Sequence, residues 1–229
     1  MKNYPELVTE RFNDANFHIN YCLKFIKKYM KGNILEIGAG CGSFTRNYIN
    51  TEINSITLTE VDDKNISDLK KKFKNNQKIK IVKGTIYNIN QKFDVIIYLH
   101  VLEHIKNDEE EIKEATKKLN IDGTLIIMVP AHQKIFSNLD SAVGHFRRYE
   151  IDFFDKKFDQ LEISSTKFLD SMGYFLYYLN KIIFKKEVYP SKLKIFIWDK
   201  IFTPISVVTD FILRYKFGKC ILAVYKKLN

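Results

Sequence analysis

The most constraining feature of the sequence is a glycine-rich loop between a short apolar run and a polar segment. Residues 33–38 are apolar enough to predict a strand, and they lead into glycines at alternate positions, Gly38, Gly40 and Gly42. Glycine permits a sharp turn and leaves no Cβ in the path of a nucleoside that approaches the backbone. Residues 43–50 then predict a helix. This order of strand, turn and helix is typical of a nucleotide-binding βαβ unit.

Two acidic residues on either side of the loop restrict the cofactor. Glu60 ends the next strand, where a carboxylate can accept hydrogen bonds from both hydroxyls of a ribose. Glu36 would repel a pyrophosphate but suits the ammonium and sulfonium groups of S-adenosylmethionine (SAM). Ser43 stands where the last glycine of the G-x-G-x-x-G dinucleotide pattern would fall. The loop therefore favours SAM over a nicotinamide dinucleotide, and a tight turn without function is the alternative.

Apolar runs alternate with helical segments along the first part of the chain. Helices are predicted at residues 14–31, 63–76 and 108–120, with Asp63 or Asn65 as the N-cap of the second of them. Alternation of this kind indicates parallel βαβ units. We expect a Rossmann-like, doubly wound α/β fold with a mostly parallel sheet of seven strands: residues 33–38, 55–61, 78–83, 93–99, 124–129, 161–168 and 220–226.

The segment between the last two predicted strands, residues 170–218, is rich in aromatic and aliphatic residues and predicts a helical insertion. We expect one domain over residues 1–229 that carries this cap. The cap is either a helical layer with its own core or a lid that excludes water and accepts an apolar or lipid-linked acceptor. If the cap is a lid, it can also contact a membrane surface, because lysines lie beside its aromatic residues at positions 181, 185 and 186 (Lys181, Lys185 and Lys186).

The composition and charge of the chain restrict its cellular compartment and its classes of binding partner. The net charge of +10 would suit nucleic acid, anionic lipid or a phosphorylated substrate, but lysines such as those at 70–72 and 74 are typical of a solvated helix face. The three cysteines are far apart and form no C-x-x-C pair, which indicates reduced thiols. The first residues carry no apolar run of a signal peptide, so we expect a cytoplasmic protein. The sequence predicts no oligomeric state.

The loop and its acidic residues resemble motif I and the ribose-binding acid of the class I SAM-dependent methyltransferases. The resemblance runs over residues 16–149 and more weakly beyond. It implies that Glu36 orients the methionine end of SAM and that Glu60, with Val61 beside it, holds the ribose. The family's adenine-binding Asp is replaced by Thr85, with Ile86 beside it. Residues implied to line the cofactor are Gly38, Ala39, Gly40, Gly42 and, at the fourth strand, Leu99.

Two further segments resemble small-molecule methyltransferases. Residues 98–105 (YLHVLEHI) are similar to an "LEH" segment of that group, and residues 144–149 (GHFRRY) resemble a loop of a bacterial methyltransferase subgroup. A base can assist transfer to a hydroxyl, whereas positioning can suffice for an acidic phenol or carboxylate, and we predict His104 and His145 as the catalytic residues. His100 and His104 have a metal-binding spacing, but a third ligand is not apparent, so no metal is predicted.

The remaining polar residues near these segments are predicted to bind the acceptor. His100, His132 and Tyr149 follow strands whose carboxyl ends carry ligands in open α/β sheets. Arg147 and Arg148 either grip a phosphate or carboxylate of the acceptor or clamp their own loop to Asp140 or Glu150. The histidines have an alternative as surface or helix-capping residues.

We expect a methyltransferase that acts on a small-molecule acceptor, most simply on oxygen. The "LEH" segment favours this function, and the Asn/Asp-Pro-Pro-Tyr sequence of many amino-nitrogen methyltransferases is absent, since residues 98–101 read YLHV. A nucleic-acid methyltransferase is an alternative prompted by the charge, although no RNA-binding motif is appended. A non-catalytic SAM-binding protein is the other alternative.

Overall fold

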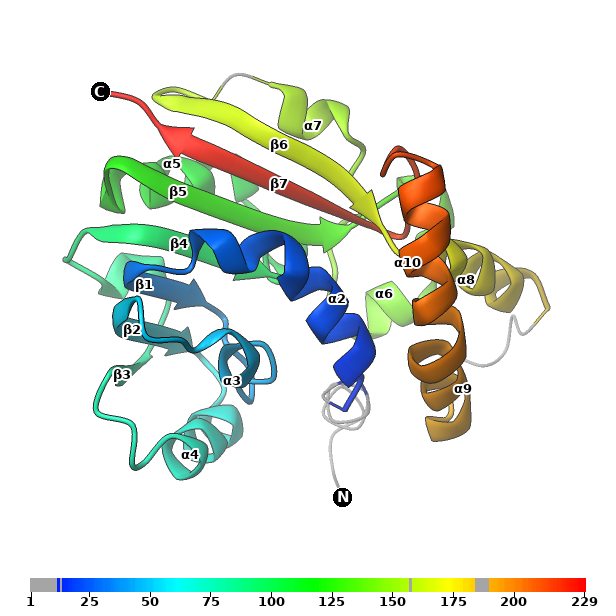
Figure 1. Cartoon of the computed structure of the whole chain (residues 1–229), viewed down its shortest axis with the longest axis horizontal. Coiled ribbons are helices and arrows are strands. Elements are labelled where there is room, and N and C mark those ends of the chain that lie inside the picture. The colour runs from blue at the N-terminus through cyan, green and yellow to red at the C-terminus, as the bar shows by residue number, and fades with distance from the viewer. Residues whose placement is uncertain (1–11, 13, 157, 184–189) are drawn as a thin grey trace.

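The computed structural model describes residues 12, 14–156, 158–183 and 190–229. Its centre is one seven-stranded sheet with the strand order β3-β2-β1-β4-β5-β7-β6 (Figure 1). Only β7 runs antiparallel to its neighbours, β5 and β6. The predicted Rossmann-like, mostly parallel sheet is confirmed. The strands are β1 (Gly32–Ile37), β2 (Ile53–Glu60), β3 (Ile79–Lys83), β4 (Phe93–Leu99), β5 (Leu119–Pro130), β6 (Leu161–Leu169) and β7 (Cys220–Lys227).

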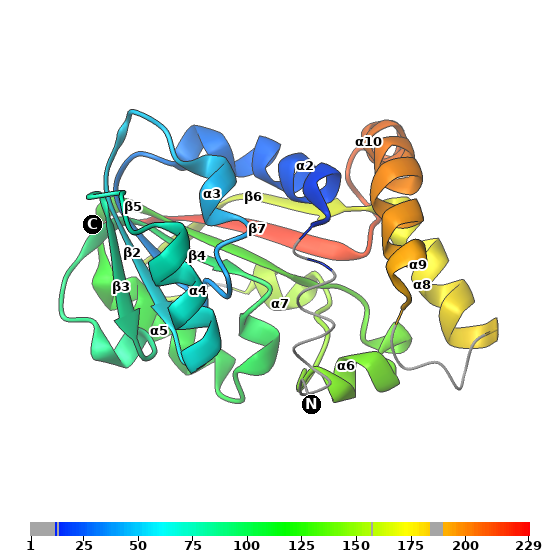
Figure 2. The same ribbon diagram turned by 90° about the horizontal axis from the view of Figure 1, so that it is seen from below.

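Helices cover both faces of the sheet, as a doubly wound fold requires, because strands that are apolar on both sides must be buried on both sides. Figure 2 shows α2 on one face and α5 and α7 on the other. The helices before β6 are α2 (Asn16–Ile26), α3 (Thr45–Tyr48), α4 (Asp63–Lys72), α5 (Asp108–Lys118), α6 (Asn138–Ala142) and α7 (Asp152–Asp155). The predicted helix at 43–50 is reduced to the single turn of α3.

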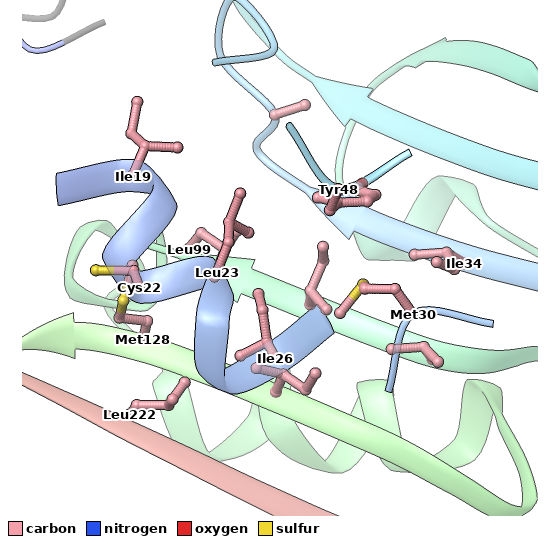
Figure 3. Packing of buried hydrophobic residues seen from close by; sticks show 14 of the residues in the cluster. Ile19, Cys22, Leu23, Ile26, Met30, Ile34, Tyr48, Leu99, Met128 and Leu222 are labelled. Carbon is pink, nitrogen blue, oxygen red and sulfur yellow. The ribbon is translucent and has the colours of Figure 1, made fainter. Parts of the chain in front are cut away.

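The core has two main clusters, one on each face. On the first face, Leu23 and Ile26 of α2 pack over the central strands, beside Leu99 of β4 and Met128 of β5 (Figure 3). On the other face, α5 contributes Ile112, which is fully buried. The alternating side chains of each strand therefore divide between two apolar layers, and the predicted buried strands are confirmed.

The strand order reverses between β1 and β4, both of which lie at the centre of the sheet. The crossover from β1 goes to β2 on one side, and the later crossover from β3 returns to β4 on the other. The loops at the carboxyl ends of β1 and β4 therefore diverge, which leaves room for a ligand at this edge. The predicted cofactor residues of the glycine loop and Leu99 stand at these two strand ends.

The described residues of the predicted insertion between β6 and β7 form the α-helices α8 (Ser171–Ile183), α9 (Lys192–Ile197) and α10 (Thr203–Ile212), and a π-helical turn (Trp198–Phe202) joins the last two. They stack at the end of the sheet to which the parallel strands point (Figure 1). Asp170, which is fully buried, joins them: it accepts hydrogen bonds from Trp198 Nε1 (3.0 Å) and Ser206 Oγ (2.8 Å) and pairs with Lys219. The insertion is thus tied to the sheet by buried polar contacts.

Smaller differences from the sequence predictions have local causes. The N-cap of α4 is Asp62, not Asp63 or Asn65, because the Asp62 carboxylate accepts the N–H of Asn65 (2.8 Å). None of the helices in the described ranges is long and apolar enough to cross a membrane. Lys185 and Lys186, invoked for membrane contact, lie outside the described residues.

Candidate functional site

The glycine loop follows β1 with three left-handed residues, Gly38 (φ 62°), Gly40 (φ 55°) and Gly42 (φ 74°). An added Cβ would meet Val101 at Gly38 (2.8 Å) and Phe73 at Gly42 (2.7 Å), so these two glycines allow close packing inside the protein. At Gly40 an added Cβ would meet no atom within 4 Å. The Cα of Gly40 therefore faces open space, in which a ligand can approach it closely.

Glu60 holds this loop from the end of β2. One carboxylate oxygen accepts the N–H of Gly40 (2.8 Å), and the other accepts those of Val61 (2.7 Å) and Asp62 (3.0 Å). The residue is only 7% exposed. Charge-assisted hydrogen bonds of this kind are strong, so Glu60 fixes the loop and the start of α4 relative to each other. Its neighbour Val61 is 61% exposed and lies beside the same edge.

Glu36 lies under the loop rather than at its surface. Its Oε2 accepts hydrogen bonds from Thr45 Oγ1 (2.7 Å) and Tyr48 Oη (2.6 Å). Burial raises the pKa of Glu36 to about 7, although the two hydroxyl donors favour the charged form. A carboxyl group with this pKa can carry a proton in the free protein and release it when a cationic group binds nearby.

The "LEH" segment begins at the carboxyl end of β4 with a sharp change of direction. His100 has φ 59°, and its N–H donates to Met128 O of β5 (2.8 Å). A 3₁₀ turn, Leu102–His104, follows and buries Glu103 completely while it leaves His104 exposed. Although burial alone would lower it, the neighbouring Cys220 and Glu103 raise the pKa of His100 to about 10.

Asp140 organises the loop that precedes the GHFRRY segment. Its Oδ1 lies 2.9 Å from His145 Nδ1 and accepts from Arg148 Nε (2.9 Å), and its Oδ2 accepts from Tyr177 Oη (2.6 Å) and Ser137 N (2.9 Å). Burial alone would raise the pKa of Asp140, but these donors and the charge of Arg148 lower it below its ordinary value. The carboxylate is therefore ionised, and it orients His145.

His145 and His104, the two predicted catalytic residues, come together although 41 positions separate them in the sequence. Their rings lie edge to face with centroids 4.6 Å apart. His104 Nδ1 is 3.3 Å from Gly144 O, and His145 Nε2 is 3.9 Å from Glu103 Oε1. Burial lowers the pKa of His104, which favours the neutral imidazole. The arrangement places two imidazole rings beside the buried carboxylate of Glu103.

Several of the residues predicted to bind the acceptor already have partners within the protein. Arg148 is 6% exposed and pairs with Asp140, the loop clamp that was one of its two predicted roles. Arg147 forms an ion pair with Asp108, and Tyr149 Oη lies 2.8 Å from the same carboxylate. His132 stacks on Phe168 with ring centroids 5.2 Å apart, and its Nε2 lies 3.1 Å from Gly218 O.

Thr85 and Ile86, expected near adenine, form a small turn after β3. Thr85 is exposed, and it donates its N–H to Asn88 Oδ1 (2.9 Å) in a capping box. Ile86 is fully buried in the second core cluster, so only its backbone can face a ligand. The site residues that sequence reasoning missed are Asp140 as the organiser and Glu103 as the buried neighbour of both histidines.

Comparisons with known proteins agree with this fold. A family model described as a methyltransferase domain matches residues 35–125. Two ubiquinone biosynthesis O-methyltransferases from Rickettsia bellii are 27% identical over 115 residues. The match covers 48% of this chain and 48% of each relative, so the aligned part is about half the length of those proteins.

Solved methyltransferases share the fold over most of the chain. The N-methyltransferase NodS from Bradyrhizobium japonicum, in complex with S-adenosyl-L-homocysteine (SAH), has a TM-score of 0.61 at 16% identity and covers 96% of this chain and 91% of its own. Coclaurine N-methyltransferase bound to N-methylheliamine and SAH gives 0.62 at 13% identity, with 93% and 72% covered. Residues 35–125 thus match a methyltransferase domain, and the chain has the fold of the class I SAM-dependent methyltransferases, whose cofactor is SAM.

Proposed function

We propose that this chain binds SAM at the glycine loop and transfers its methyl group to an oxygen of a small-molecule acceptor. The observation that carries the proposal concerns Gly40: a Cβ added there would meet no atom within 4 Å. Gly40 lies where the strand order reverses, in the loop that Glu60 fixes. In this proposal Gly38, Ala39 and Gly40 face SAM. The ribose hydroxyls would donate to the Glu60 carboxylate, either in place of the backbone N–H groups that donate to it in the free protein or together with them.

The acceptor is proposed to bind between the glycine loop and the "LEH" segment, with His145 as the activating group. Asp140 accepts a hydrogen bond from Nδ1 and so holds the ring in a position from which Nε2, when deprotonated, can receive or share a hydroxyl proton. The neutral His104 lies beside it. Oxygen is the proposed acceptor atom because a hydroxyl needs such a group, and the name of the Rickettsia relatives supports it.

The cap formed by α8, α9 and α10 is proposed to favour an apolar or lipid-linked acceptor and to touch a membrane surface. Its side chains include exposed Lys192 and Arg214, which suit anionic headgroups. Large apolar side chains exposed on the cap are Phe175, Tyr178, Leu179, Ile182, Leu193, Phe196, Ile201, Ile205, Val208, Phe211 and Ile212. Such an apolar surface is uncommon on a protein without a partner.

Calorimetric titration with SAM and, separately, with NAD tests the cofactor half of the proposal. We expect micromolar affinity for SAM and no heat from NAD. An acceptor screen then measures SAH release with phenolic, sugar and lipid-linked compounds. Protein that is folded, free of bound ligand and unable to bind SAM would overturn the proposal. SAM binding with methylation of an amine alone would overturn the choice of oxygen.

A further inference from the structure

Three potential metal ligands from two separate segments converge beside the proposed acceptor position. Glu103 and His104 belong to the turn after β4, and His145 belongs to the loop after α6. One ligand atom from each of the three residues lies within 4.8 Å of the other two. The backbone joins the two segments as well, since Phe146 N donates to Glu103 O (2.8 Å). The cluster is therefore built by the fold rather than by mobile surface side chains.

The Glu103 carboxylate is the feature that indicates a cation. Glu103 is completely buried, and within the described part of the chain neither of its oxygens has a hydrogen-bond partner. Its nearest cationic or polar neighbours are His100 Nδ1 at 3.6 Å and His145 Nε2 at 3.9 Å. An ionised carboxylate without hydrogen bonds in the interior costs several kcal/mol, and a bound metal ion would offset that cost.

The surroundings of His145 match those of a metal-ligating histidine. A ligating imidazole usually donates its second ring N–H to a carboxylate or a carbonyl, which fixes the tautomer and turns the other nitrogen to the ion. His145 Nδ1 has the Asp140 carboxylate at 2.9 Å, and His104 Nδ1 has the Gly144 carbonyl at 3.3 Å. Both histidines are therefore held in the tautomer that leaves Nε2 free.

We propose that Glu103, His104 and His145 bind a divalent metal ion of the Mn²⁺, Co²⁺ or Zn²⁺ type. Two imidazoles and one carboxylate suit these ions better than Mg²⁺ or Ca²⁺, which prefer oxygen ligands. Three atoms 4.8 Å apart have a centre ~2.8 Å from each, so shifts of less than about 1 Å bring them to metal–ligand distances. Exposed His104 gives the ion a path from solvent.

The role of the ion in catalysis rests on the proposed function. The bound ion would take the acceptor oxygen into its coordination shell and lower the pKa of the hydroxyl. The acceptor proton would then leave to solvent, the oxygen would form its bond to the methyl carbon, and the carbon–sulfur bond would break to give SAH. With the ion bound, His145 would serve as a ligand, and the ion would take over the activation of the hydroxyl that the proposed function assigns to His145.

A second cluster, His18, His100 and Cys220, also brings three ligand atoms within 4.8 Å. His18 is buried and its Nε2 already lies 3.5 Å from Cys22 Sγ, and Cys220 is also buried. Its third member, His100, is only partly exposed, whereas the Glu103 cluster has the exposed His104. The cluster around Glu103 is therefore the proposed site, and the buried cluster serves as an alternative outcome of the test.

Titration of the whole EDTA-treated chain with Co²⁺, followed by visible absorption and calorimetry, tests the proposal without any methyl acceptor. We expect one ion per chain and a weakening of at least about 10-fold in Glu103→Gln, His104→Ala and His145→Ala. Exposed Glu110→Gln, a surface carboxylate on α5, should bind as the unchanged protein does. Circular dichroism checks that each variant folds, and the exposed position of His104 makes its variant the safest.

The possible results separate the hypotheses. No Co²⁺ binding by the unchanged protein, or equal binding in all three variants, would overturn the proposal. Loss of binding in Cys220→Ser but not in Glu103→Gln would move the ion to the other cluster and would overturn it too. SAM affinity measured in the same samples reports on the proposed function separately, so failure of one does not imply failure of the other.

Discussion

The buried Asp140 and the partly buried His145 form a carboxylate–imidazole pair in which Asp140 Oδ1 lies 2.9 Å from His145 Nδ1. The carboxylate is ionised and only accepts, so Nδ1 carries the proton of this hydrogen bond, and Nε2 lies on the Glu103 side, 3.9 Å from Oε1. This pair fixes the orientation of the ring that we place beside the acceptor. It also sets the first prediction.

Asp140→Asn should lower turnover by about 10²-fold while SAM affinity changes little, because His145 loses the orientation of its ring. It should also lower the free energy of unfolding by roughly 3–5 kcal/mol, since Arg148 is left buried without a charge partner. Steady-state kinetics and urea unfolding measure the two effects. Tyr177→Phe removes only the donor to Oδ2 and should cost about 1 kcal/mol with a much smaller loss of turnover. Equal turnover losses would contradict the role of the pair.

Gly40→Ala and Gly42→Ala should separate ligand binding from packing. Both place alanine at a positive φ, which costs roughly 1–2 kcal/mol. Gly42→Ala also drives a Cβ against Phe73 and should lose a further ~1–3 kcal/mol. Gly40→Ala should instead lose SAM affinity, because only its Cβ points into open space. Thermal unfolding measures the stability of both variants, and calorimetry measures their affinity for SAM. An unchanged SAM affinity in Gly40→Ala would contradict this assignment.

Glu60→Gln should weaken SAM binding by about 10-fold or more and lower stability by ~1–3 kcal/mol. The stability loss is expected because the carboxylate accepts three backbone N–H groups in the free protein. Asp63→Asn, an exposed neighbour that pairs with Lys83, is the matched control and should change neither quantity much. If Glu60→Gln is fully folded and binds SAM as tightly as the unchanged protein does, Glu60 is not part of the ribose site.

Glu36 should make stability depend on pH. Its folded pKa of about 7 lies above the ordinary 4.5, so folding favours the protonated form. The contribution of Glu36 to stability is therefore fully present below pH ~4.5 and is lost as pH rises through about 7. The free energy of unfolding that Glu36 contributes should fall by on the order of 3 kcal/mol over this pH range. Urea unfolding measures the free energy of unfolding at pH 5 and pH 8. Relative to the unchanged protein, Glu36→Gln should be more stable at pH 8 than at pH 5. An equal stability difference at both pH values would contradict the raised pKa of Glu36.

Replacement of Phe211 and Ile212 by serine should weaken binding to anionic vesicles by at least about 10-fold, because both side chains are largely exposed on α10 and supply apolar area. Cosedimentation with vesicles of phosphatidylglycerol and phosphatidylcholine measures the change. Ile121→Ser, an equally exposed position at the start of β5, should have no effect. If the unchanged protein stays in the supernatant, the cap does not touch membranes.

The sheet could be predicted from the sequence because its strands are apolar on both faces and end in recognisable turns. The fourth strand, residues 93–99, is the clearest example, since its observed bounds agree with the prediction. Asp62 was missed as a cap because three acidic or amide residues compete for that position within one turn. Propensity alone does not decide between them.

The candidate site was predictable where it follows a strand and less so where it depends on a loop. Glu36, Glu60 and the glycines lie beside β1 and β2, so their spacing places them. Glu103 meets His145 only because the loop around Asp140 folds back on the turn after β4. That return depends on side-chain hydrogen bonds between distant residues, for which the sequence has no local signal.

The position of β7 has a consequence for the order of events during synthesis. β7 lies between β5 and β6, and the three helices of the cap precede it in the chain. Until Cys220–Lys227 has left the ribosome, β6 has no strand to pair with and the edge of β5 is open. Such an edge can pair with another chain. A nascent chain paused before residue 220 should therefore be the form most in need of a chaperone.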